Sequence, residues 1–297
     1  MRRSGLGSGL QRGRSAHPDA DGPAGRQIRK TLHGTRRLKP TTSSLQQGWR
    51  YTRLVLHLLQ GVLTAALVFP WVSLDRRGRL RQRWSTGLLA LLGIVPRVSG
   101  AELARPALLI ANHVSWVDIF AINTLSPSAF VSKADVRQWP IIGWLAAMNE
   151  TVFLQRGSRG HARIINAEIA TRMAAGRHVA VFPEGTTTDG SHVQHFHAAL
   201  LQPAIAAGQP VQALAVCYRT PDGEFTRAAA YDGDLSVLDS LKAIIATPRI
   251  EVHLTVLPAI ATTDAKRRDI AAQAHAAISA VVNPPDAADI APVREAA

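Results

Sequence analysis

Asn112, His113 and Asp118 form the part of this sequence best suited to carry out chemistry. An imidazole can take a proton from an alcohol near neutral pH, and a carboxylate on its far nitrogen fixes the tautomer and stabilises the imidazolium that forms. The apolar run at residues 106–111 predicts a buried strand before the histidine, and residues 117–122 can open a helix after it. We therefore expect the pair at the carboxyl end of a strand, where open α/β sheets bind their ligands.

The same pair also fits an ordinary loop histidine and a helix-start carboxylate, because this spacing arises often by chance. Three other predicted strands favour the catalytic interpretation over this simpler one, since each ends in polar groups. They are residues 130–133, which end in Lys133, residues 151–157, which contain Arg156, and residues 180–187, which run into a loop with Pro183 and Gly185. If these strands run parallel, their polar ends share one edge of the sheet with His113.

The motifs in these segments resemble those of the glycerolipid acyltransferase family, most closely the 1-acylglycerol-3-phosphate acyltransferases. Three motifs match in order: N-H-x4-D at Asn112, His113 and Asp118, F-x-x-R at Phe153 and Arg156, and F-P-E-G-T at residues 182–186. The resemblance covers about residues 100–260. The chain departs from the fourth motif at residues 210–214, which read P-V-Q-A-L with alanine where a second proline is expected. This departure bears on acyl-chain or acceptor preference.

The resemblance implies a role for each matched residue. His113 is expected to act as general base on the acceptor hydroxyl, which attacks an acyl thioester, while Asp118 orients the imidazole and no covalent acyl-enzyme forms. Lys133 and Arg156 are expected to hold the acceptor's phosphate, together with backbone amides of the glycine-containing loop. Glu184 is expected to brace Arg156 or to accept a hydroxyl from the acceptor. The predicted substrate-binding set is Asn112, Lys133, Phe153, Arg156, Glu184, Gly185 and Thr186.

Several residues also have simpler interpretations. Arg156 fits a solvated cation in a run with two further arginines. His192, His195 and His197 lie close together, but no cysteine or carboxylate has metal-ligand spacing beside them, so we expect loop residues near the substrate. The sequence contains no G-x-S-x-G, phosphate-loop or H-E-x-x-H motif, and we predict no metal and no bound cofactor. Cys217 stands alone in an apolar strand and is expected to pack there.

The positive charge of the chain lies in its amino-terminal third. The formal net charge is +13, and residues 1–100 hold 18 of the 34 Lys and Arg but 3 of the 21 Asp and Glu. No nucleic acid is expected as a partner, because no DNA-binding motif or aromatic-interleaved basic face accompanies this charge. Residues 54–74 carry no formal charge and, as a helix, are long enough to cross a hydrocarbon layer of roughly 30 Å. Trp49, Tyr51 and Trp71 lie near the ends of this stretch, as interfacial anchors do.

Five arginines between residues 76 and 83 follow, and then a second apolar stretch at residues 84–96 that is too short to span comfortably. Basic residues flank residues 54–74 on both sides, so a crossing helix and a helical pair within one leaflet both stay open. In either arrangement the arginines are expected to bind anionic headgroups. We predict an anionic membrane surface as a partner and a location on the cytoplasmic face of a bacterial-type inner membrane.

The predicted fold class is α/β: a layered domain with a largely parallel, mixed sheet flanked by helices and preceded by an amino-terminal membrane-associated helical segment. Four regions are expected: a disordered basic arm at 1–45, the membrane-associated helical segment at 46–98, the catalytic domain at 99–285 and a flexible tail at 286–297. Helices are expected near 115–125, 136–147, 160–175, 197–207 and 264–283, and strands near 106, 129, 151, 178, 211 and 251.

The function implied by the resemblance is transfer of a fatty acyl group from acyl-CoA or acyl-carrier protein to the free hydroxyl of 1-acylglycerol-3-phosphate. The product is phosphatidate, an intermediate of phospholipid biosynthesis. An alternative acceptor is another lysolipid such as lyso-ornithine lipid, which lacks phosphate. A non-catalytic membrane-binding module that keeps the fold is a further alternative, and the intact pair of His113 and Asp118 argues against it.

Overall fold

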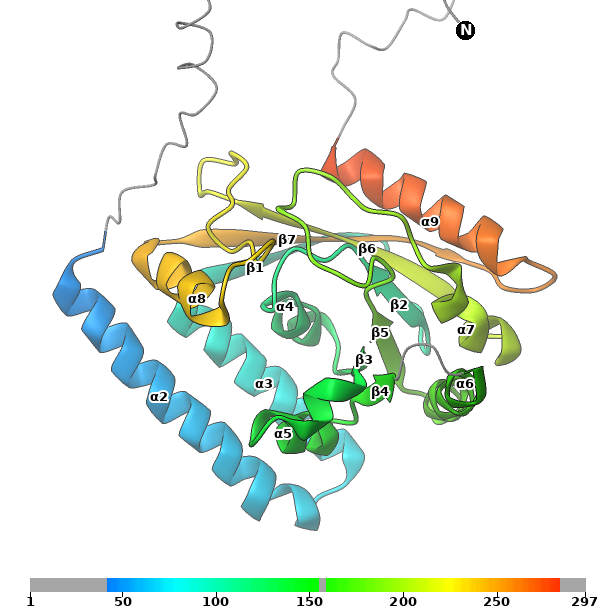
Figure 1. The fold of residues 1–297 in the computed structure, drawn as a ribbon, viewed down its shortest axis with the longest axis horizontal. Helices are drawn as coiled ribbons and strands as arrows, with labels where there is room; N and C mark the ends of the chain where they lie inside the picture. Colours follow the sequence, from blue (N-terminus) through cyan, green and yellow to red (C-terminus); the bar gives the residue numbers. More distant parts are fainter. Residues whose placement is uncertain (1–41, 155–158, 284–297) are drawn as a thin grey trace, which may run out of the picture. The chain divides into compact units, whose positions relative to one another are not determined.

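A seven-stranded sheet forms the centre of the fold (Figure 1) in a computed structural model that describes residues 42–154 and 159–283. The strands are β1 (Ile94–Gly100), β2 (Leu108–Ala111), β3 (Ser128–Lys133), β4 (Val152–Leu154), β5 (His178–Val181), β6 (Val211–Arg219) and β7 (Ile250–Ile260). Their order is β1-β7-β6-β2-β5-β3-β4, and β6 pairs with β7 antiparallel whereas every other neighbouring pair is parallel. This confirms the predicted mixed, largely parallel sheet.

Helices cover both faces of this sheet. They are α2 (Ser44–Leu67), η1 (Phe69–Trp71), α3 (Leu74–Leu92), α4 (Asp118–Leu125), η2 (Ala134–Gln138), α5 (Ile142–Met148), α6 (Arg159–Ala174), η3 (Ala198–Leu201), α7 (Gln202–Ala206), α8 (Val237–Ala246) and α9 (Arg267–Val282). One apolar core joins the sheet to α3, α4 and α8, and a second joins its other face to α6, α7 and α9. Figure 1 shows these helices on the two sides of the strands.

The strand β2 illustrates why a continuous apolar run is needed at the centre. Successive side chains of a strand point to opposite faces, so Leu109 and Ala111 enter the core with α3 and α4, whereas Leu108 and Ile110 enter the core with α6 and α9. All four residues are buried. A strand covered on both faces therefore shows no alternation of apolar and polar residues, and it places the residues that follow it at the carboxyl edge of the sheet.

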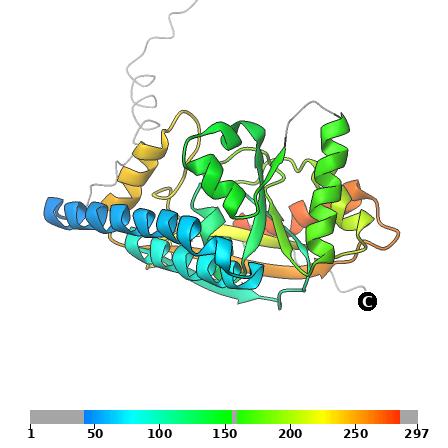
Figure 2. The same ribbon diagram turned by 90° about the horizontal axis from the view of Figure 1, so that it is seen from below.

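The long helix α2 lies beside α3 on the surface of the fold (Figure 2). Ser43 and Gln46 form a capping box at its start. His57 and Trp84 fix the two helices together, since their rings stack with centroids 4.8 Å apart, Trp84 Nε1 donates to the His57 carbonyl at 3.0 Å, and His57 Nε2 bonds the Trp84 carbonyl at 2.9 Å. Arg50 donates to the carbonyls of Ile245, Thr247 and Pro248 at the end of α8.

Two elements were missed by the sequence reasoning, and one predicted stretch is divided. Residues 84–96 were expected to form a second apolar segment, but α3 ends at Leu92 and β1 begins at Ile94. Gly93 adopts a φ of 75° between them and ends the helix. Residues 94–98, assigned to the membrane segment, are therefore part of the sheet. Pro96 obscured β1 in the sequence, and it is tolerated because β1 is an edge strand. The helix α8 was the other missed element.

Candidate active site

Asn112 comes directly after β2 and joins this strand to β6. Its side-chain oxygen accepts from the Val216 amide at 2.8 Å, and its side-chain amide donates to the Val216 carbonyl at 2.9 Å. The side chain is fully buried. We predicted that Asn112 binds substrate, whereas in the structure both polar ends of this side chain are bonded within the sheet. The Asn112 side chain pairs with the backbone of β6 as one further peptide group of β2 would, so it extends the pairing of these two strands.

His113 and Asp118 lie in hydrogen-bond contact, as their spacing predicted. His113 Nδ1 is 2.9 Å from Asp118 Oδ2, and the carboxylate is fully buried whereas the imidazole is 18% exposed. An ionised carboxylate accepts hydrogen bonds and cannot donate them, so Nδ1 carries the proton and Nε2 is the basic nitrogen of the neutral ring. The imidazole also stacks on the Phe182 ring, with centroids 3.8 Å apart. The pair thus has the geometry of an oriented general base.

Asp118 is held by donors on several sides. Besides His113, its Oδ2 accepts from the backbone amides of Val114 and Ser115 at 2.8 and 2.9 Å. Its Oδ1 accepts from the Tyr218 hydroxyl at 2.6 Å. Because Asp118 is also the first residue of α4, the turn of chain from His113 to this helix closes around its carboxylate. These donors replace the hydration that the carboxylate loses on burial.

Glu184 fastens the loop after β5 to the loop that carries the histidine. Its Oε1 accepts from the His113 amide at 2.7 Å and its Oε2 accepts from the Gln194 amide at 2.8 Å. Thr188 closes the same junction by donating its backbone amide to the His113 carbonyl at 2.8 Å. Burial raises the pKa of the Glu184 carboxyl, and hydrogen bonds from Gln194 and His113 partly oppose that rise. We predicted a substrate contact for Glu184, whereas the structure gives its two oxygens to the backbone.

The remaining predicted residues follow neighbouring parallel strands. Lys133 ends β3 and is exposed, and Phe153 lies in β4, where it is buried beneath the Arg137 guanidinium at 5.5 Å from the ring centroid. Gly185 has a φ of 69°, which a glycine adopts readily, and Thr186 is exposed. Arg156, which we predicted to bind phosphate, lies outside the described residues. The parallel order of β2, β5, β3 and β4 places these strand ends on one edge of the sheet.

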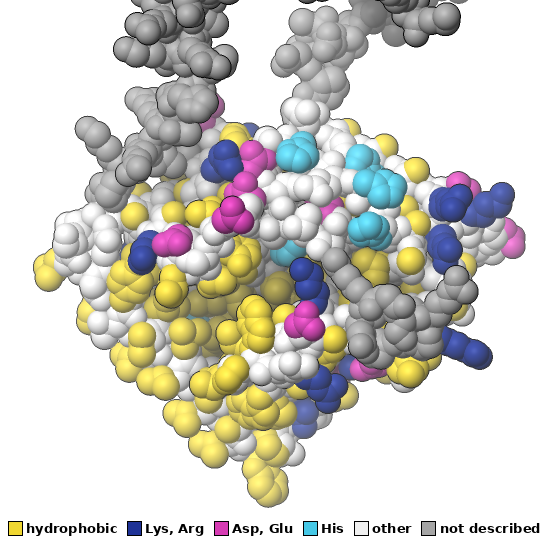
Figure 3. Space-filling view, viewed as in Figure 1, with side chains coloured by type: hydrophobic (Ala, Val, Ile, Leu, Met, Phe, Trp, Pro, Cys, Tyr) yellow, Lys and Arg dark blue, Asp and Glu magenta, His cyan; other side chains and the backbone are white. Residues whose placement is uncertain are grey.

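Histidines gather on the surface above this edge (Figure 3). His192, His195 and His197 are all exposed, and the rings of His195 and His197 lie edge to face with centroids 6.1 Å apart. Across residues 42–154 and 159–283, no group of three or more His, Cys, Asp and Glu residues has the arrangement of a metal site. These histidines belong to the loop between Thr188 and η3, which Glu184 and Gln194 tie to the site.

Tyr218 was missed as a site residue. The sequence placed it in the apolar strand of Cys217, and the packing prediction concerned only Cys217. The signal was present in the chemistry of the residue, because a buried tyrosine hydroxyl requires a hydrogen-bond partner. Its alternation with Leu214 and Val216 put it on the face of β6 that carries α4. The identity of its partner could not be read from the sequence, since Asp118 is 100 residues away.

Comparison with known proteins gives concordant results. A family model described as Acyltransferase matches residues 95–217. The chain is 41% identical over 218 residues to a lyso-ornithine lipid O-acyltransferase of Pseudomonas aeruginosa, covering 70% of this chain and 84% of that protein. It is 34% identical to a 1-acyl-sn-glycerol-3-phosphate acyltransferase of Neisseria meningitidis, covering 73% and 85% of the two chains. The crystal structure of a 1-acyl-sn-glycerophosphate acyltransferase from Thermotoga maritima is similar in fold, with a TM-score of 0.55, 21% identity and coverage of 78% and 96%.

Replacing Glu184 with Gln is expected to destabilise the protein, because an amide offers one acceptor where two backbone amides now need one each. The lost bond costs about 1–3 kcal/mol, which thermal unfolding by circular dichroism detects as a lower midpoint. Glu224→Gln, at an exposed position, is the matched control and should leave the midpoint unchanged. Equal midpoints for both variants and the parent would show that Glu184 does not fasten the two loops.

Proposed function

The chain belongs to the acyltransferase family and is an acyltransferase of the lysophospholipid type, and we propose that it uses His113 to activate the hydroxyl of a lysolipid for attack on an acyl thioester. The observation that carries this proposal is the contact of 2.9 Å between His113 Nδ1 and the buried Asp118 carboxylate. That contact leaves Nε2 as the basic nitrogen of a partly exposed ring. A group with these properties suits proton removal from an alcohol.

The proposed reaction proceeds by direct transfer. Nε2 of His113 takes the proton as the acceptor oxygen attacks the thioester carbonyl, and a tetrahedral intermediate forms. Its collapse expels the thiolate, which recovers the proton from the imidazolium, so that an ester and a free thiol are produced. Asp118 stabilises the transient imidazolium. Acyl-CoA and acyl-carrier protein both supply the required thioester, and both remain proposed donors.

Two acceptors have support from different observations. Lyso-ornithine lipid is the first, because the Pseudomonas relative named for it is 41% identical, whereas the Neisseria relative named for 1-acyl-sn-glycerol-3-phosphate is 34% identical over a similar share of its length. The second is 1-acylglycerol-3-phosphate, the acceptor expected from the motifs, which Lys133 and Arg156 would bind through its phosphate. The described residues place Lys133 at an exposed strand end on the edge of the sheet that carries His113.

An extended apolar surface supports a membrane as the partner. The region Ser44–Trp71 is long and apolar enough to cross a membrane, and 17% of its most apolar window is buried. Figure 3 shows apolar side chains spread over the side where α2, α5 and α8 lie. Its large exposed residues include Trp49, Val55, Leu56, Leu58, Leu59, Leu63, Leu67 and Trp71 near or in α2, Trp139, Ile141, Ile142 and Trp144 near or in α5, and Leu235, Val237 and Leu238 near or in α8. We call this the apolar surface.

The contacts of α2 favour a position in one leaflet. Arg50 holds the start of this helix on α8, and its later turns contact α3 and α5. A crossing helix has its ends on opposite sides of roughly 30 Å of hydrocarbon. Here the helix contacts one folded unit along its length, so crossing would carry charged parts of that unit into the hydrocarbon. We therefore propose insertion of the apolar surface into the cytoplasmic leaflet, where soluble thioester donors reach the site.

The arginines of α3 complement this surface, with one correction to the sequence prediction. Arg76, Arg79 and Arg83 are exposed, and their spacing puts them along one side of the helix. Arg81 is buried and donates to the Asn149 carbonyl at 2.8 Å, so it has a structural role and does not bind headgroups. The three exposed arginines are the proposed contacts to anionic lipids.

His113→Ala is expected to lower turnover by about 10²- to 10⁴-fold, because the general base is lost. Asp118→Asn should also be severe, since an amide cannot stabilise the imidazolium as a carboxylate does. Release of free thiol from a labelled acyl thioester, with lysolipid present, measures both effects. His253→Ala, on β7, is the control and should keep full activity. Near-normal turnover by His113→Ala would refute the proposed mechanism.

The two acceptors can be separated with purified protein. We expect a kcat/KM for lyso-ornithine lipid at least about tenfold above that for 1-acylglycerol-3-phosphate, with products identified by mass spectrometry from a labelled acyl-CoA. Lys133→Ala should then leave acceptor kinetics nearly unchanged. A preference for 1-acylglycerol-3-phosphate, with a raised KM for it in Lys133→Ala, would assign the phosphate-bearing acceptor instead.

The membrane proposal is tested by flotation with vesicles of phosphatidylethanolamine and phosphatidylglycerol. The parent protein should stay bound at high salt, because its apolar surface is inserted. A triple variant with Leu56, Leu59 and Leu63 replaced by Glu should not float, whereas Ile164→Glu, at an exposed position of α6, should float normally. Replacing Arg76, Arg79 and Arg83 with Gln should weaken binding to anionic vesicles only. Full release of the parent protein by salt would contradict insertion.

A further inference from the structure

Of the hydrogen-bond donors to Asp118 that the described part of the chain supplies, Tyr218 comes from a distant strand. We propose that Tyr218 is a positioning residue, whose hydroxyl fixes the orientation and charge of the Asp118 carboxylate and thereby sets the pH at which His113 works as a base. This inference rests on the proposed role of His113 and adds a third residue to the pair. It concerns a buried side chain that belongs to none of the motifs.

The two oxygens of the Asp118 carboxylate have different hydrogen-bond partners. Oδ2 accepts from His113 Nδ1 and from two backbone amides, those of Val114 and Ser115. Oδ1 accepts from the Tyr218 hydroxyl at 2.6 Å, within the short range typical of a hydroxyl bonded to an ionised carboxylate. The donors on both oxygens fix the plane of the carboxylate. That plane determines the direction in which the imidazole of His113 points.

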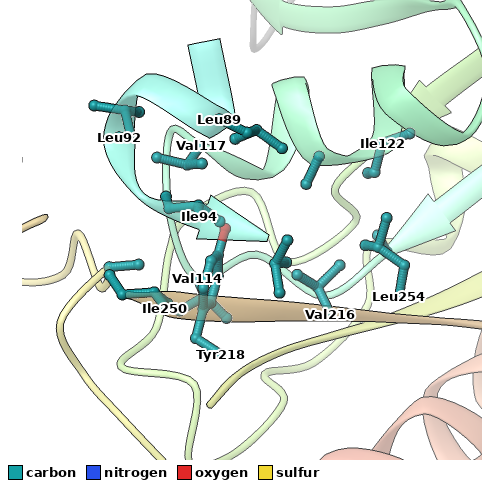
Figure 4. Packing of buried hydrophobic residues seen from close by; sticks show 14 of the residues in the cluster. Leu89, Leu92, Ile94, Val114, Val117, Ile122, Val216, Tyr218, Ile250 and Leu254 are labelled. Atoms are coloured by element: carbon teal, nitrogen blue, oxygen red, sulfur yellow. The ribbon is translucent and has the colours of Figure 1, made fainter. Parts of the chain in front are cut away.

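The ring of Tyr218 is fixed by the core, so its hydroxyl is a rigid donor. It is 2% exposed and belongs to the cluster that holds Ile94, Val117 and Ile250, as Figure 4 shows. The charged group that acts on the Tyr218 hydroxyl is the Asp118 carboxylate, which accepts its hydrogen bond. Glu184 accepts from the backbone amide of His113 and is the charged group next to this pair.

The hydroxyl keeps its proton throughout the pH range in which a histidine titrates. Burial raises the pKa of Tyr218 well above its usual value, and the charge and hydrogen bond of Asp118 raise it further. Tyr218 therefore always donates to the carboxylate. A donor on a carboxylate draws away part of its negative charge, so the carboxylate attracts an imidazolium less strongly. Removal of the hydroxyl should strengthen that attraction, so His113 should hold its proton to higher pH.

Tyr218→Phe removes this hydroxyl and keeps the ring that packs in the core. We expect kcat to fall by about tenfold, with the KM values for donor and acceptor little changed, because the lost bond orients the base and does not bind substrate. The acidic limb of the kcat/KM profile should move to higher pH. Cys217→Ala is the matched control, since this neighbour points to the opposite face of β6, and its profile should equal that of the parent.

A second measurement needs no substrate. Histidine ring signals followed by NMR across pH, with the His113 signal identified by its loss in His113→Ala, should show a later titration of His113 in Tyr218→Phe. In an Asp118→Asn background, Tyr218→Phe should add little, because the effect passes through that carboxylate. A lower thermal midpoint, with the His113 titration and the acidic limb both unchanged, would overturn the proposal and leave Tyr218 a packing role.

The two readouts keep this inference separate from the proposed function. If His113→Ala kept normal turnover, the general-base role would be lost, yet the NMR titration would still report whether Tyr218 controls His113. If His113 proved essential while Tyr218→Phe left its titration unchanged, the general-base role of His113 would be supported and the role of Tyr218 would be refuted.

Discussion

The buried charge of Asp118 is the constraint on which the site depends. A carboxylate without exposure is costly unless donors surround it. The donors here come from the adjacent backbone, from His113 and from Tyr218 on another strand. Meeting that requirement bends the chain tightly between β2 and α4 and fixes the tautomer of the histidine. The orientation of the His113 imidazole thus follows from how the fold supplies donors to one buried carboxylate.

Three adjacent strands at the centre of the sheet supply this arrangement. β2 leads into Asn112 and His113, β5 leads into Glu184, and β6 carries Tyr218 near its end. Asn112 and Glu184 both bond backbone groups across to a neighbouring segment, so they hold the loops against one another. Motif residues that resemble substrate ligands in the sequence can therefore have a structural role instead. A polar side chain at a strand end suits either role, because it can bond a neighbouring loop or a substrate.

Local patterns in the sequence predicted what depends on local spacing. The contact between His113 and Asp118 and the position after β2 followed from five residues of separation and one apolar run. The parallel order of the sheet followed from the alternation of strands and helices. Long-range partners were not accessible, because nothing in the sequence pairs Tyr218 with Asp118 or Gln194 with Glu184. Pro96 also obscured β1, because proline within a strand is tolerated mainly at a sheet edge, and the edge position of β1 could not be read from the sequence.

The helix α2 and the loop that carries His113 belong to one packed unit. Hydrogen bonds from Arg50 to the end of α8 and the stacked rings of His57 and Trp84 hold α2 against the rest of the fold. The cluster that buries Leu54 of α2 also contains Val114 and Val117 of the loop around Asp118. In the proposed mode of membrane binding, insertion of the apolar surface would fix the depth of His113 relative to the lipid headgroups. A lysolipid hydroxyl lies close to the headgroup region, so a rigid connection reduces the positional freedom that the acceptor must lose before it reaches the base.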